Sequence, residues 1–266
     1  MPLLKLANRT REISIFIDMI EDQKDTLPKI LFLEAPRNFG KSWLLRRFSE
    51  ICDDRGLAHL LVSLNSGNRN PTSFMEYVCE HLEICSDLCF DSYKSERSKI
   101  EERDSNIVLQ RIRLRDNNTI QVNSTHYNDN ILKQLQRNFF KDITSFSDRC
   151  IFLIDTYEEA SESLGNWMED FFLPFVCRNR NLIFVIAGQV IPNPGRIEWQ
   201  ANAQRISISG IKDPQIWYSF FGESSFLLPG NSLENSRAIL EAFIKVAEGN
   251  PGELMRYIDI LKVELP

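Results

Sequence analysis

The feature that most constrains this chain is the stretch Glu34-Ala35-Pro36-Arg37-Asn38-Phe39-Gly40-Lys41-Ser42. An apolar run over 30–33 precedes it, and a helix-forming run over 43–48 follows it. A strand, a tight loop ending in Gly-Lys-Ser and a helix together make the phosphate-binding P-loop arrangement. Backbone N–H groups of the loop and the helix dipole both favour phosphate there. The stretch therefore predicts a nucleotide site at the end of a buried strand.

The loop departs from the pattern G-x-x-x-x-G-K-[ST] at one position, where Ala35 replaces the first glycine. Alanine adds only a methyl group, so we interpret it as a tolerated variant. Lys41 is expected to reach the β/γ-phosphates, and the Ser42 hydroxyl to bind Mg²⁺. A chance Gly-Lys-Ser is the alternative, and the strand and helix on either side argue against it. The predicted nucleotide-binding residues of the loop are Ala35, Pro36, Arg37, Asn38, Phe39, Gly40, Lys41, Ser42 and Trp43.

A second apolar run, 150–154, ends at Asp155. A buried parallel strand there would deliver this carboxylate to the Mg²⁺ held by Ser42. Thr156 follows Asp155, where a catalytic carboxylate often stands, so Glu158 and Glu159 are the nearest candidates for polarising a water. Surface carboxylates at a strand-to-helix turn are an equally open interpretation.

A third buried run, 181–187, ends at Gly188-Gln189. Ligands of open α/β folds bind at the carboxyl ends of the strands. Gln189 is therefore a candidate sensor of the γ-phosphate. Together with the apolar runs at 29–33, 59–64 and 204–208, this pattern predicts an α/β fold: a three-layer α/β/α P-loop NTPase with a mainly parallel sheet.

Composition narrows the function classes. The chain has 266 residues and a net charge of −6, whereas a dedicated nucleic-acid binder would more often be basic. No run approaches the ~18 apolar residues of a membrane helix, and the N-terminus does not resemble a signal peptide. The six cysteines include one pair, Cys85 and Cys89, with no His cluster, which favours buried free thiols over zinc. These features indicate a cytoplasmic protein with no membrane partner.

Three further parts of the chain give expectations about its organisation. Residues 86–104 are polar and predict a mobile or surface-bound segment. Residues 106–122 form two alternating runs around Asp116-Asn117-Asn118, which predicts a β-hairpin insertion. From Gly210 onwards the sequence pattern predicts helices only, so we expect a nucleotide-binding domain over 1–209 and a helical lid over 210–266.

The order of these parts resembles the STAND class of AAA-related P-loop ATPases, of bacterial or cyanobacterial type. Besides the P-loop, the stretches 151–159 and 185–189 resemble the metal-binding and sensor strands of that class. Residues 8–12 resemble its N-terminal Arg-Glu motif, which places Arg9 beside the adenine, although spacing alone indicates a helix start capped by Asn8 or Thr10. The segment 248–254 resembles its Gly-x-Pro motif, whose proline, here Pro251, lies against the base.

The resemblance implies a switch that binds ATP or ADP with Mg²⁺, hydrolyses ATP slowly, and controls self-association or signalling to a protein effector, often in bacterial defence. The implied catalytic residues are Lys41, Asp155, Glu158 and Gln189. A non-hydrolysing adaptor is the alternative, since Ala35, Thr156 and Gln189 depart from the active pattern. A DNA-handling ATPase is a third, less favoured alternative.

Overall fold

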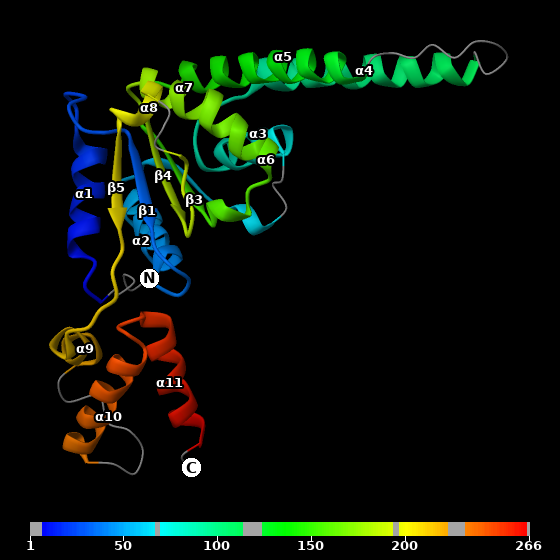
Figure 1. Ribbon diagram of the computed structural model, residues 1–266. Coiled ribbons are helices and arrows are strands. Elements are labelled where there is room, and N and C mark those ends of the chain that lie inside the picture. The colour runs from blue at the N-terminus through cyan, green and yellow to red at the C-terminus, as the bar shows by residue number, and fades with distance from the viewer. Residues whose placement is uncertain (1–6, 67–69, 114–123, 194–196, 223–231, 265–266) are drawn as a thin grey trace.

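The centre of the molecule is a five-stranded, entirely parallel sheet in the order β2-β3-β4-β1-β5 (Figure 1). The structure is a computed structural model and describes residues 7–66, 70–113, 124–193, 197–222 and 232–264. The five strands predicted for the sheet are confirmed to within one or two residues. They are β1 (Ile30–Glu34), β2 (Ala58–Ser63), β3 (Cys150–Asp155), β4 (Leu182–Gly188) and β5 (Ala203–Ser207).

Helices cover both faces of the sheet, which gives the predicted three layers. On one face, α1 (Thr10–Glu21) and α2 (Lys41–Asp54) pack against Leu31 and Leu33 of β1. Phe16 of α1 and Phe48 of α2 stack there with ring centroids 4.1 Å apart. Because side chains alternate along a strand, Ile30 and Phe32 belong to the other face.

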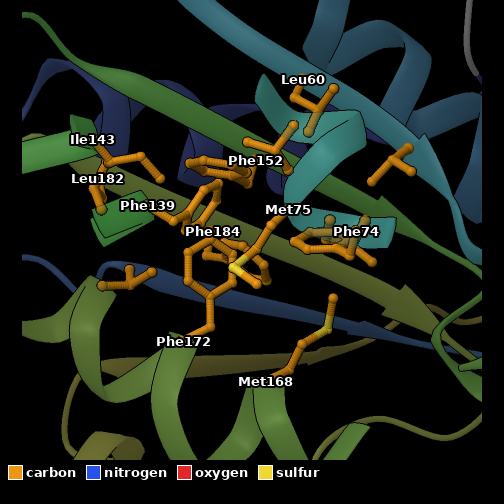
Figure 2. Packing of buried hydrophobic residues seen from close by; sticks show 14 of the residues in the cluster. Leu60, Phe74, Met75, Phe139, Ile143, Phe152, Met168, Phe172, Leu182 and Phe184 are labelled. Carbon is orange, nitrogen blue, oxygen red and sulfur yellow. The ribbon is translucent and has the colours of Figure 1, made fainter. Parts of the chain in front are cut away.

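The second face holds the larger core, in which Phe172 packs among other aromatic rings (Figure 2). Its ring meets Phe152 of β3 and Phe184 of β4 edge-on, with centroids 5.3 and 5.0 Å away. The helices on this side are α3 (Pro71–Cys85), α5 (Ser124–Ser145), α6 (Glu162–Trp167) and α7 (Leu173–Arg178), with a π-helical turn, η3 (Met168–Phe172), between the last two. Trp167 and Phe172 are buried in this core, whereas Phe171 is exposed.

The segment after α3 differs from the predicted hairpin. Residues 91–113 form one long helix, α4 (Asp91–Arg113), which pairs with α5 and projects with it from the body (Figure 1). The predicted β-hairpin is therefore wrong over 106–113, and its remainder lies outside the described residues. Its apolar residues also fit helical spacing, and two long helices satisfy their own backbone hydrogen bonds, whereas a lone hairpin is marginal. The segment is also anchored rather than mobile, because Leu88, Phe90 and Tyr93 are buried.

The C-terminal helices α9 (Pro214–Phe221), α10 (Leu233–Val246) and α11 (Pro251–Glu264) lie beyond the carboxyl edge of the sheet (Figure 1). They have a hydrophobic cluster of their own around Trp217, Leu240 and Leu254. Two short elements after strand ends, η1 (Leu64–Ser66) and η2 (Tyr157–Glu159), and the short helix α8 (Ile197–Gln200) complete the order. None of the described helices is long and apolar enough to cross a membrane.

The anchoring of residues 86–93 gives the first prediction. Phe90 is fully buried and stacks on Phe139 of α5 at 5.6 Å, so Phe90→Ala should lower the free energy of unfolding by about 3–5 kcal/mol, measured by urea denaturation. The matched control is Cys89→Ala, because Cys89 is the exposed neighbour. A change as small for Phe90→Ala as for Cys89→Ala would contradict the anchoring.

Candidate functional site

The predicted P-loop connects β1 to α2 with the backbone that a phosphate cradle needs. Gly40 has a φ of 87° at the start of α2, a conformation that favours glycine. Asn38 has a φ of 66°, which Asn tolerates better than most residues. The methyl group of Ala35 is buried, and the Ala35 N–H donates to the carbonyl of Gly188 on β4, 3.2 Å away. The substitution at the first glycine is therefore accommodated by packing against the sheet.

Lys41 is buried inside the loop. Its Nζ donates to the carbonyls of Ala35 and Pro36, at 2.6 and 2.8 Å. Burial lowers the pKa of its ammonium group, and the carboxylates of Glu158 and Asp155 oppose that shift. The side chain is thus a buried cation that is held within the loop by two backbone carbonyls.

Asp155 and Ser42 supply the oxygen atoms that suit a magnesium ion. Asp155 is 9% exposed at the end of β3, and its Oδ1 accepts the N–H of Thr156 at 2.9 Å. Both side chains line the same cavity. Carboxylate and hydroxyl oxygens are hard ligands, and Mg²⁺ in such sites completes its shell with water and phosphate oxygens. The donor set therefore fits Mg²⁺ in the company of a nucleotide.

Glu158 is held by Gln189. The Gln189 backbone N–H donates to Oε2 of Glu158, and the Gln189 side-chain amide donates to Oε1, both at 2.9 Å. Burial alone would raise the pKa of Glu158, but these hydrogen bonds and the charge of Lys41 bring it below its usual value. Both predicted residues are therefore at the strand ends, joined to each other.

Two carbonyls of the loop accept hydrogen bonds from residues 250–252, at the start of α11. The Arg37 carbonyl accepts from the Asn250 side chain at 3.3 Å, and the Asn38 carbonyl accepts from the Gly252 N–H at 2.9 Å. The first turn of α11 therefore lies directly on the loop. A Cβ at residue 252 would stand 2.6 Å from that of Asn38, so the approach requires glycine.

A cavity of about 770 Å³ lies between the P-loop and the C-terminal helices. The loop, Asp155 and Glu158 form one end, and residues of α9 and α11 form another part of the wall. Its lining is Ala7, Arg9, Arg37, Asn38, Phe39, Gly40, Lys41, Ser42, Trp43, Asn65, Asp155, Thr156, Glu158, Glu159, Ile211, Trp217, Phe220, Pro251, Gly252, Met255 and Asp259.

Most of the predicted site residues meet at this cavity. Ala35, Pro36 and Gln189 do not line it, and each acts on it through a neighbour, Lys41 or Glu158. Arg9 lines it, but its guanidinium contacts protein carbonyls, as described below. Arg9 itself occupies the cap position of α1, without a side-chain cap bond, so the predicted caps are wrong.

The sequence interpretation missed the walls that the helices contribute. Met255 and Asp259 follow Pro251 at intervals of four residues, so they share its face of α11. Trp217 and Phe220 are three residues apart on α9. This helical spacing was the one signal in the sequence that could have indicated a cavity wall. Core residues of a helix have the same spacing, so the signal does not distinguish the two.

Comparison with known proteins places the fold. No model of a protein family matches the chain, and no curated protein matches its sequence. AMPPCP-bound DnaA from Aquifex aeolicus aligns with a TM-score of 0.52 and 12% identity, over 98% of this chain and 63% of that one. This chain thus spans less than two thirds of that DnaA chain. A Walker-type ATPase of Pyrococcus abyssi aligns with a TM-score of 0.45 and 12% identity, over 96% and 72%. The likeness to DnaA shows a shared fold, that of the P-loop NTPases.

The contact between Gln189 and Glu158 gives the second prediction. Gln189→Ala should raise the pKa of Glu158 towards its usual 4.5, measured by NMR titration of the carboxyl carbon. Because the folded-state pKa is depressed, ionised Glu158 stabilises the fold above that usual value, and the stabilisation is lost as pH falls through the folded pKa. The variant should lose less stability on acidification. Gln215→Ala, an exposed glutamine of α9, is the control, and an unmoved Glu158 titration in Gln189→Ala would contradict the assignment.

Proposed function

We propose that this chain binds ATP with Mg²⁺ in the cavity and works as a nucleotide-dependent switch, in which the C-terminal helices act as a lid. One observation carries the proposal: a single cavity has the P-loop in one wall and α9 and α11 in another. A ligand that fills it touches both parts of the chain at once. Such a ligand stabilises the closed arrangement, because only that arrangement offers all the contacts.

The chemistry of the two ends supports a nucleotide. The loop N–H groups, the N-terminus of α2 and Lys41 suit phosphates. The wall formed by Ile211, Trp217, Phe220 and Met255 is apolar and aromatic, which suits a base. A volume of about 770 Å³ is within the usual range for a ligand of this size. A solved structure with the same fold, DnaA, is bound to AMPPCP, an analogue of ATP.

The state of Glu158 favours slow hydrolysis. A residue that polarises the attacking water must accept a proton from it, so a more basic carboxylate does this better. Here each oxygen of Glu158 accepts a hydrogen bond from Gln189. These bonds help to lower the pKa of Glu158, so it is a weaker base. If Glu158 does not activate a water at all, the chain is the non-hydrolysing adaptor.

The finer assignment follows the resemblance of the motifs. A STAND-type switch would use the closed state to control self-association or a protein effector, and we extend the proposal to that role. A DNA-handling ATPase stays an alternative, because the fold is shared with proteins such as DnaA. The net charge of −6 disfavours it, and a steeply salt-dependent affinity for DNA would favour it.

The phosphate end gives the third prediction. Lys41→Ala should weaken ATP binding in Mg²⁺ buffer by at least about 2 kcal/mol, because a charge-assisted contact is lost. Isothermal calorimetry measures the affinity, and Lys141→Ala, an exposed lysine of α5, is the control.

The same assay tests the metal: an affinity for ATP that is equal in Mg²⁺ and in EDTA would refute the Mg²⁺ assignment. Phosphate release above the Lys41→Ala background separates the slow ATPase from the adaptor.

The lid gives the fourth prediction, which tests the switch itself. Saturating ATP should slow amide hydrogen exchange over 249–254, because the nucleotide adds contacts to the closed state only. Pro251→Ala should reduce this protection more than it reduces the free energy of unfolding. Equal exchange over 249–254 with and without saturating ATP would mean that the helices are a passive cap.

A further inference from the structure

Arg9 joins two parts of the chain that are far apart in sequence. One guanidinium nitrogen, Nη2, donates to the carbonyl of Phe39 in the P-loop at 3.0 Å and to the carbonyl of Ser209 at 3.2 Å. The other, Nη1, donates to the carbonyl of Asn8 at 3.3 Å. Its planar fork of donors suits this arrangement, because several acceptors can be engaged at fixed angles.

Ser209 marks the connection between β5 and the C-terminal helices. Two residues on, the Ile211 N–H donates to the carbonyl of Gly249 at 2.7 Å, in the turn between α10 and α11. That turn leads to Gly252, whose N–H bonds the loop at Asn38. These four hydrogen bonds, together with the short backbone segments 38–39, 209–211 and 249–252 between them, form a closed ring.

Burial makes this ring costly to open at Arg9. The side chain is 5% exposed, and the carboxylate of Glu12 stands 4.0 Å from it. Moving Ser209 or Phe39 away would leave guanidinium N–H groups without acceptors in a site that excludes most water. A buried donor that loses its partner carries the full cost of its desolvation, and a charged one carries more.

We propose that Arg9 is a positioning residue that ties the phosphate loop to the connection at 209–211, so that the loop and the lid turn move as one unit. This deepens the proposed switch and rests on it. Arg9 then acts on the nucleotide through the loop and the connection, and it transmits a shift of either to the other. This role differs from the base contact that the family resemblance implies.

The test is amide hydrogen exchange of the intact, nucleotide-free chain, measured residue by residue. The Gly252 and Ile211 amides report the ring, and the Phe184 amide, bonded to Lys29 in the sheet, reports global opening. Arg9→Gln should speed exchange at Gly252 and Ile211 by about tenfold or more, as for lost hydrogen bonds to a charged group, and leave Phe184 unchanged. Arg11→Gln, an exposed arginine two residues along α1, should change none of the three.

Two outcomes overturn the proposal. Equal acceleration of exchange at all three amides would show that Arg9 only stabilises the fold. Unchanged exchange at Gly252 and Ile211 would show that Arg9 does not link the loop to the connection at 209–211. If Arg9→Gln does not fold, Arg9→Lys decides, because it keeps the charge beside Glu12 but loses the fork. The same two amides should then respond, to a smaller extent, and their failure to respond overturns the proposal. Absence of ATP binding to the unaltered chain would refute the proposed function and leave this exchange result standing.

Discussion

A phosphate loop turns its N–H groups inward, and its carbonyls must then find donors elsewhere. In this chain the carbonyls of Arg37, Asn38 and Phe39 each accept a hydrogen bond from outside the loop. The donors come from α11, its preceding turn and the start of α1. Because these donors lie near opposite ends of the chain, the N-terminal helix and the C-terminal helices must both converge on the carboxyl edge of the sheet. The conformation of the loop and the placement of the flanking elements therefore depend on each other.

The parts of the site that the sequence predicts are those fixed by local rules. A strand, a loop with Gly40 and a helix place Lys41 without reference to the rest of the fold, and parallel pairing brings Asp155 to the same edge. Gln189 lies at that edge for the same reason. What local rules leave open is whether such a side chain faces the ligand or a neighbour. Gln189 bonds Glu158, and only the packed structure shows that.

The misassigned segment shows a different limit. Over 106–113 the spacing of the apolar residues fits both a strand and a helix, so hydrophobic periodicity alone cannot distinguish the two. The helix is selected by its neighbours: α4 begins where Phe90 and Tyr93 enter the core, and α5 runs beside it. Similarly, Arg9 lies in a charged stretch whose spacing predicts a helix start capped by Asn8 or Thr10. The burial of Arg9 depends on tertiary contacts that the local sequence does not reveal, because two of its acceptors are 30 and 200 residues away in sequence.

The ring of hydrogen bonds also bears on how much a nucleotide must contribute. Moving a lid from mostly open to mostly closed takes a preference of about 5.5 kcal/mol when the ligand supplies all of it. In the switch that we propose, the protein's own contacts, Gly252 to Asn38, Asn250 to Arg37 and Arg9 to Ser209, would favour the closed arrangement before any ligand binds. The ligand would then need to supply only the remainder. Coupling between sites is reciprocal, so contacts that hold the proposed lid on the loop would also hold the loop ready for phosphate. A chain whose first loop glycine is replaced by Ala35 can thus obtain a preorganised loop from its packing rather than from glycine.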